Sequence, residues 1–279
     1  MNVVSNMAVF SSRRSIFGLQ VCDLNWPEAF TFVSALADVP IGQTAVSFLN
    51  AHNANLMLAD PSYREVLSRH LVLPDGVGVD LASLAMHGRT FPANLNGTDF
   101  VPALLTYMTT PKRVGLVGGR PDVLERAREG FASHTPWHEF VAIHDGFFAE
   151  DESDAVADEI ARHKVDILLI AMGTPKQELW IDRYIRPEHA RLVFGVGALF
   201  DFMAGEFTRA SEKARSLRVE WFHRFRLEPK RLWRRYFVGG PIFGMRIVGH
   251  VAGEWLSALR GAERGRRHRL SDSGAGGRR

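Results

Sequence analysis

Short apolar runs alternate with amphipathic stretches from residue 15 to about residue 200. The runs are rich in β-branched residues and stop at Gly, Pro or a polar residue, which is typical of buried strands. Apolar residues recur at helical spacing in the stretches between them, several of which carry Pro near the start. The pattern predicts helices alternating with strands at residues 16–24, 44–51, 71–76, 113–119, 140–146, 165–173 and 191–197.

This alternation predicts an α/β fold: a Rossmann-like, mostly parallel sheet with helices on both faces, formed by residues 1–208. Right-handed crossovers place the C-terminal ends of all parallel strands at one edge of the sheet. Ligands of such sheets bind at that edge. Polar residues that follow these strands are therefore the candidates for chemistry.

The pattern changes after residue 208, where aromatic and basic residues mix at helical spacing and Gly and Pro then interrupt an apolar stretch. We predict a basic helical appendage over residues 209–260 that lies on a surface instead of spanning a bilayer. The last segment, 261–279, is basic and poor in apolar residues, and we predict that it is disordered.

The net charge of +3 over 279 residues conceals an uneven distribution. Residues 1–208 carry 16 Lys and Arg against 25 Asp and Glu, a net charge of −9, whereas residues 209–279 carry 18 against 6, a net charge of +12. An acidic body with a basic C-terminal part indicates an anionic partner: a phosphate, a nucleic acid or a membrane surface.

The number of cysteines and the spacing of the histidines bear on disulfide bonds and metal sites. The single cysteine, Cys22, excludes a disulfide or a cysteine-based metal site within the chain and fits a reducing cytoplasm. The eleven histidines form no H-x-x-H or H-E-x-x-H pair, so we expect no metal and no cofactor. We also expect neither a secretory signal nor a simple membrane-spanning helix.

Two strand ends carry candidate groups in turns. Asp75, in "LPDG", could take a proton from an attacking hydroxyl, although aspartate is also common in turns for its own hydrogen bonds. Gly118 and Gly119, in "VGLVGGRPD", would let backbone N–H groups approach a phosphate, although a tight turn explains them equally well. The segment matches neither G-x-G-x-x-G nor a Walker A loop, which favours a nucleotide diphosphate over NAD.

The third candidate is "GTPKQELW", a polar cluster directly after the most apolar strand. Lys176 offers a point charge for phosphate, and the Gln177 amide suits a base or a sugar hydroxyl. Thr174 belongs to the same cluster. Glu178 has a simpler explanation as a helix cap.

Several segments together resemble the WecG/TagA/CpsF family of bacterial glycosyltransferases. They cover roughly residues 15–240, in the family's order and spacing: "LPDGVGVDLAS", "NGTDFVPALL", "VGLVGGRPDVLERA", "DGFF", "VDILLIAMGTPKQELWI", "FGVGALFDFMAGEFTRA" and "VEWFHRFRLEPKRLWRRY". The resemblance implies inverting, metal-independent transfer of a sugar from a UDP-sugar to a polyprenyl-diphosphate-linked saccharide, in surface or exopolysaccharide synthesis. It places the enzyme peripherally on the inner face of the cytoplasmic membrane, with an appendage that closes the active site, and allows a homo-oligomer.

Individual roles follow from the same resemblance. Asp75 matches the family's general base, Asn50 an asparagine at the preceding strand end, and Gln177 the glutamine of "PKQE". Three appendage arginines would neutralise the diphosphates: Arg224, Arg231 and Arg234. Two departures are Phe48, where some members carry threonine, and "FTRASEK", which lacks the proline that usually follows Arg-Ala. The donor sugar and the acceptor stay open; glucuronosyl and N-acetylmannosaminyl transfer are both allowed.

Two other classes compete with this interpretation. An NAD-dependent oxidoreductase is permitted by the glycine-rich turn but lacks the G-x-G-x-x-G fingerprint. A nucleic-acid-binding protein could use the basic segment, with Trp221, Phe225, Trp233 and Tyr236 stacking on bases. A membrane-surface helix explains those residues equally well, and the acidic body opposes a nucleic-acid partner, so we expect none.

Overall fold

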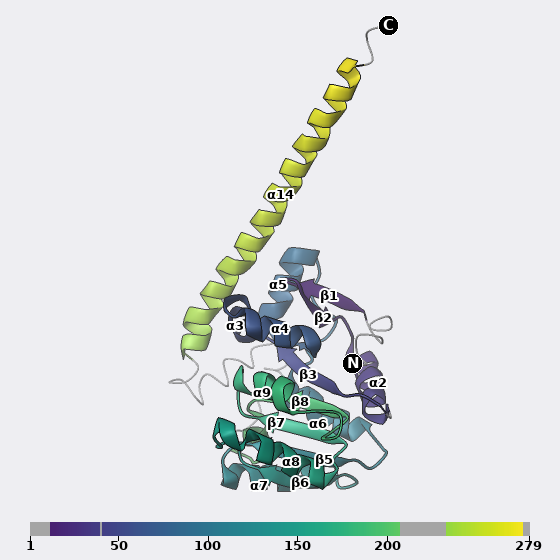
Figure 1. The fold of residues 1–279 in the computed structure, drawn as a ribbon, viewed down its shortest axis with the longest axis vertical. Coiled ribbons are helices and arrows are strands. Elements are labelled where there is room, and N and C mark those ends of the chain that lie inside the picture. Colours follow the sequence, from purple (N-terminus) through teal and green to yellow (C-terminus); the bar gives the residue numbers. More distant parts are fainter. Residues whose placement is uncertain (1–11, 40, 207–232, 276–279) are drawn as a thin grey trace.

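The structure, a computed structural model, describes residues 12–39, 41–206 and 233–275, with side chains as far as residue 257. Figure 1 shows an α/β body and a long C-terminal helix that leaves it. Residues 209–232 of the predicted appendage lie outside the described residues. The division of the chain at residues 208 and 260 therefore stays a prediction.

A six-stranded sheet forms the centre of the body, and every strand pairing in it is parallel. Along the sheet the order is β4 (Leu71–Pro74), β3 (Thr44–Leu49), β8 (Leu192–Gly195), β7 (Ile167–Ala171), β5 (Arg113–Gly118) and β6 (Glu139–His144). The predicted Rossmann-like α/β class is confirmed. Because the order differs from the order along the chain, strands distant in sequence become neighbours.

Helices cover both faces of this sheet, since successive strand residues point to opposite sides. In β7, Ile167 and Leu169 pack into one hydrophobic cluster, whereas Leu168 and Ile170 pack into another. The first cluster includes residues of α2 (Trp26–Asp38), α6 (Gly97–Tyr107), α7 (Pro121–His134) and α10 (Leu199–Met203). The opposite side holds α3 (Ala51–Ala59), α4 (Pro61–Arg69), α5 (Val77–His87), α8 (Ser153–His163) and α9 (Lys176–Tyr184). The short helix η1 (Glu150–Glu152) directly precedes α8.

The prediction of one strand over residues 16–24 is wrong. The chain instead forms an antiparallel hairpin of β1 (Arg13–Ile16) and β2 (Leu19–Cys22), which is separate from the main sheet. Phe17 and Gly18 both have positive φ, 51° and 84°, as a two-residue hairpin turn requires. A Phe–Gly pair is not one of the usual turn signals, so the turn was read as strand.

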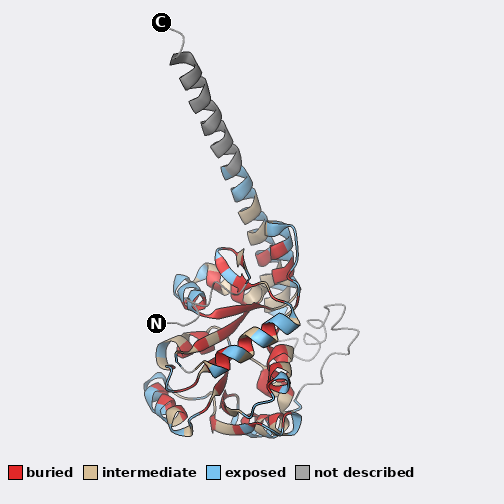
Figure 2. Ribbon diagram, turned by 90° about the vertical axis from the view of Figure 1, so that its right-hand side faces the viewer, coloured by how far each residue is buried: buried red, intermediate tan, exposed pale blue. Residues whose placement is uncertain are grey.

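The C-terminal segment comprises η2 (Arg234–Val238) and α14 (Gly239–Ala275). Early in α14, Phe243 is buried in a cluster shared with α3 and α5, and Arg246 donates to the Asn55 carbonyl oxygen at 2.7 Å. Burial is concentrated in the body and sparse along α14 as far as residue 257, where the described side chains end (Figure 2). The helix extends to Ala275, and the disorder predicted for residues 261–279 stays a prediction.

Within the described ranges, no helix is both long enough and apolar enough to cross a membrane.

Candidate active site

Two cavities open at the C-terminal ends of four neighbouring strands, β4, β3, β8 and β7. The first, the polar cavity, has a volume of about 350 Å³. Its wall includes residues that follow each of the four strands: Asn50, Asp75, Gly173, Thr174, Gln177, Glu178, Gly197 and Asp201. Strand ends brought together in this way are the usual ligand site of a parallel sheet.

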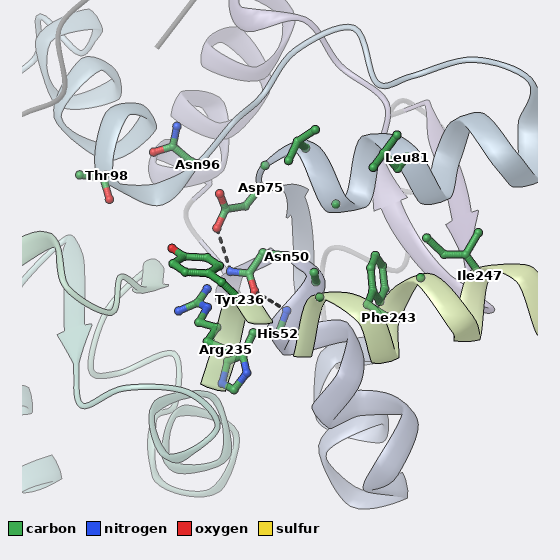
Figure 3. A pocket seen from close by; sticks show the side chains of 16 residues that line it. Asn50, His52, Asp75, Leu81, Asn96, Thr98, Arg235, Tyr236, Phe243 and Ile247 are labelled. Carbon is green, nitrogen blue, oxygen red and sulfur yellow. Dashed lines mark hydrogen bonds between the residues drawn. The ribbon is translucent and has the colours of Figure 1, made fainter. Parts of the chain in front are cut away.

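The second, the mixed cavity, has a volume of about 360 Å³ and extends from the ends of β3 and β4 towards the C-terminal helix. Asn50, Asp75, Asn96 and Thr98 line its polar end. Its other end lies between α5 and α14 and is lined by apolar side chains, including Leu81, Phe243 and Ile247 (Figure 3). The cavity therefore suits an amphipathic ligand with one polar and one apolar part.

Five residues line both cavities: Asn50, His52, Asp75, Thr98 and Arg235. Two molecules bound in the two cavities would meet at these residues. A group transferred from one molecule to the other would have to pass there. We name these five shared residues the reaction centre, because a transfer between the cavities would take place there.

Asp75 and Asn50 form a fixed pair within the reaction centre. The Asn50 amide nitrogen donates to Asp75 Oδ2 at 2.9 Å (Figure 3), while Asn50 Oδ1 accepts from the backbone N–H groups of His52 and Asn53. Asn50 thus caps α3 and orients the carboxylate at once. Gly76 follows with φ +88°, a backbone conformation that favours glycine and turns the chain immediately after the carboxylate. Asp75 is left partly exposed at the cavity wall.

The C-terminal segment completes the centre. Figure 3 shows Arg235 and Tyr236, both from η2, beside the Asn50–Asp75 pair. Among the described residues that line either cavity, Arg235 is the only lysine or arginine. Burial, followed by the charge of Arg235, lowers the pKa of His52 to about 4. The imidazole is therefore neutral at physiological pH, and Arg235 is the cationic side chain in the walls of both cavities.

The cluster of residues 174–178 is more deeply buried than its position at the sheet edge suggested. Gln177 is 2% exposed and Glu178 is 1% exposed, yet both line the polar cavity. Gln177 Oε1 accepts from the Gly197 backbone N–H at 3.1 Å, and Thr174 Oγ1 donates to Glu178 Oε1 at 2.9 Å. Burial raises the pKa of Glu178.

Three residues predicted from strand ends, Gly118, Gly119 and Lys176, lie outside the linings of both cavities. Gly118 ends β5, and a Cβ added there would come within 2.5 Å of the Ala171 carbonyl oxygen, so close backbone packing alone explains that glycine. Lys176 points its ammonium towards the Gly146 carbonyl oxygen at 3.4 Å and over the Phe148 ring. Their binding roles stay predictions.

The predicted arginines are only partly placed. Arg224 and Arg231 lie outside the described residues. Arg234 is exposed, with its guanidinium carbon 5.8 Å from the centre of the Trp233 ring, whereas its neighbour Arg235 lines both cavities. Phe48 lines the polar cavity and is 7% exposed; a Cβ at Gly97 would approach its ring to 2.8 Å.

Sequence reasoning missed four residues at the site: His52, Thr98, Arg235 and Glu178 as a cavity residue. Thr98 lies in "NGTDF" and His52 two positions after Asn50, so the motifs held a signal for both. Nothing local distinguishes Arg235 from the arginines around it. Among the described residues, no group of three or more His, Cys, Asp and Glu side chains could hold a metal ion.

Comparison with known proteins agrees with this geometry. The sequence profile described as "Glycosyl transferase WecG/TagA/CpsF family" matches residues 14–256. An N-acetylglucosaminyldiphosphoundecaprenol N-acetyl-β-D-mannosaminyltransferase of Bacillus subtilis (strain 168) is 32% identical over 200 residues, which is 71% of this chain and 76% of the relative. The enzyme of the same name from Bacillus spizizenii (strain W23) is 30% identical over 213 residues, 75% of this chain and 81% of the relative.

Proposed function

Because the chain belongs to the WecG/TagA/CpsF family of glycosyltransferases, we propose that it transfers a sugar from a UDP-sugar to a polyprenyl-diphosphate-linked saccharide. The family and the transferase class confirm the expectation from the sequence, and the oxidoreductase and nucleic-acid-binding interpretations lose their basis. The donor, the acceptor, the inverting and metal-independent chemistry, and action at the inner face of the cytoplasmic membrane are the proposal.

One observation carries it: the two cavities meet at a carboxylate that can act as a base. The relatives' names describe an acceptor with a saccharide, a diphosphate and an undecaprenyl lipid. Such a molecule has a polar and an apolar part, as the mixed cavity has. The polar cavity would then take the nucleotide sugar, with the Gln177 amide and Arg235 at its wall.

The chemistry follows from a single displacement. An acceptor hydroxyl in the mixed cavity attacks the anomeric carbon of the donor sugar while Asp75 accepts the hydroxyl proton. The bond from the anomeric carbon to the diphosphate oxygen breaks, and UDP leaves with the electron pair of that bond. Attack from the face opposite the leaving group inverts the anomeric configuration. Asn50 keeps the Asp75 carboxylate in place, and Arg235 offsets the charge that develops on the leaving diphosphate.

The decisive experiment measures UDP release by the full-length protein from a panel of UDP-sugars, with a synthetic N-acetylglucosaminyl-diphosphoprenol as acceptor. Mass and NMR spectra of the product give the linkage and its anomeric configuration. Metal independence requires an unchanged rate in the presence of EDTA. No product with any UDP-sugar, together with no UDP binding, would refute the proposed donor class.

A matched pair of variants tests the base. Asp75→Asn keeps the shape of the side chain but removes the proton acceptor, and should lower the rate by about 10²–10⁴. The control is Asp145→Asn, since Asp145 also stands before glycine at a strand end but is absent from the lining of either cavity. Comparable rates for the two variants would remove Asp75 from the mechanism.

A further inference from the structure

Glu178 is a buried carboxyl group in the wall of the polar cavity. Its Oε1 accepts from Thr174 Oγ1 at 2.9 Å and from Gln177 Nε2 at 2.8 Å. Its Oε2 is buried and makes no hydrogen bond to a described residue. Its described hydrogen-bond partners are both uncharged, and an ionised carboxylate buried without a cation is costly.

Glu178 also determines how the neighbouring amide is turned. The Gly197 backbone N–H can only donate, so the atom of Gln177 that it reaches at 3.1 Å must be the carbonyl oxygen Oε1. The amide nitrogen then gives one of its two hydrogens to Glu178. One N–H of Gln177 remains for other partners, in a side chain that lines the polar cavity.

We propose that Glu178 is a positioning residue: as a neutral carboxylic acid it holds the Gln177 amide so that the second N–H donates to an oxygen of the ligand in the polar cavity. The class of ligand, a nucleotide diphosphate sugar, rests on the proposed function. A neutral Glu178 suits such a ligand, because an ionised Glu178 would repel its diphosphate.

Among the described residues, no cation is a hydrogen-bond partner of Glu178. Helix α4 presents Tyr63, a buried phenol whose pKa is raised by its burial and by the nearby Glu178. The surface pairs of α9 join Asp182 to Arg69 and Arg183 to Glu150. The remaining groups lie around the polar cavity: His52, Asp75, Asp201 and Arg235. Burial raises the pKa of Glu178, in keeping with the neutral form.

A ligand-free experiment tests the protonation state. Glutamate in the unfolded chain has a pKa of about 4.3. If the folded pKa is higher, the folded state holds the proton between the two values, so its stability falls as pH rises through that range. The denaturant midpoint of Glu178→Gln should therefore increase relative to the midpoint of the wild type as pH rises above about 4.3. If the difference between the midpoints of Glu178→Gln and the wild type does not change with pH, Glu178 is not a neutral acid and the proposal is wrong. The exposed control Glu129→Gln should show such a constant difference from the wild type.

A binding experiment tests the positioning role, with UDP as the probe in calorimetry at neutral pH. Glu178→Gln keeps an uncharged acceptor for the Gln177 amide and should bind UDP as the wild type does. Glu178→Ala should lose about tenfold, as much as Gln177→Ala, and the double variant should lose no more. Additive losses, or a Gln variant as weak as the Ala variant, would overturn the proposal.

The two experiments separate this proposal from the proposed function. If the wild type binds no UDP, the donor assignment fails, and the pH dependence of unfolding still decides whether Glu178 is neutral. If Glu178→Ala does not fold, the test uses Glu178→Gln and Thr174→Val. Without the Thr174 hydroxyl, Glu178 keeps Gln177 as its hydrogen-bond partner, so Thr174→Val should weaken UDP binding less than Gln177→Ala does.

Discussion

The α/β body and the C-terminal segment contribute opposite charges to one site. The body supplies the carboxyl groups of Asp75 and Asp201 to the cavity walls, whereas η2 supplies Arg235. The whole sequence is divided in the same way, with a net charge of −9 over residues 1–208 and +12 over residues 209–279. Under the proposed function, a diphosphate substrate would use both regions: one to accept a proton, the other to offset negative charge.

The two regions also differ in how they are held. Three hydrophobic clusters stabilise the body, and their members come almost entirely from its own strands and helices. The described part of α14 adds one fully buried side chain, Phe243, and hydrogen bonds around Asn55, which donates to the Gly239 carbonyl oxygen at 2.8 Å. The described part of the segment is thus held to the body by few buried side chains. The walls of both cavities are complete only while η2 is docked, because Arg235 lines both.

Truncation after Glu206 should have the largest effect. The body keeps its sheet and clusters and should stay folded, but without η2 and α14 it loses Arg235 and one wall of the mixed cavity. We expect transfer to fall below detection and UDP binding to weaken strongly. Truncation after Ser257 is the matched control, because it keeps η2 and the docked start of α14, and should keep UDP affinity. Full-rate transfer by the shorter body would show that the segment is not part of the site.

Phe243→Ala should have the next largest effect, because it removes the main apolar anchor of α14. Burial of a phenylalanine at such a position is worth about 3–5 kcal/mol, so docking should weaken by at least roughly a hundredfold. Hydrogen exchange of α14 should rise, and transfer should fall, with the unfolding midpoint of the body unchanged. Met245→Ala, at a side chain 66% exposed, should alter neither. Equal destabilisation of the body would mean that the two regions fold as one unit.

Arg235→Ala should lower UDP affinity by roughly ten- to a hundredfold, since hydrogen bonds to charged groups contribute about 1.5–3 kcal/mol. Arg162→Ala, on the distant helix α8, should leave affinity unchanged. Calorimetry with UDP measures both, and Arg234→Ala should fall between them because Arg234 is absent from both cavity linings. A larger loss at position 234 than at 235 would restore the assignment that the family resemblance implies.

The smallest effect concerns the membrane surface. Each basic residue near an anionic leaflet contributes about 1 kcal/mol, and salt screens this attraction. Full-length protein should bind anionic vesicles more weakly, by several-fold, as salt rises, and should bind neutral vesicles weakly throughout. The body that ends at Glu206 should show no such binding in co-sedimentation. Retention of the truncated body on anionic vesicles would place the membrane contact on the acidic region instead.

The sequence by itself determined which segments are strands and which polar residues follow them. Asn50, Asp75 and Gln177 were each found in this way, because apolar periodicity and turn chemistry are local properties of the chain. The family motifs added the reaction class. The β1–β2 hairpin was missed because its turn lacks a local signal.

Only the tertiary structure decided which strand ends meet. The C-terminal ends of all the strands were expected to line one site. The cavities instead lie at the ends of β4, β3, β8 and β7, and Gly118, the last residue of β5, lies outside the cavity linings. It also decided that Glu178 is buried and that Arg235, rather than Arg234, lines the cavities. The physical reason is that strand order and helix docking depend on contacts between residues far apart in the chain, which no local pattern records.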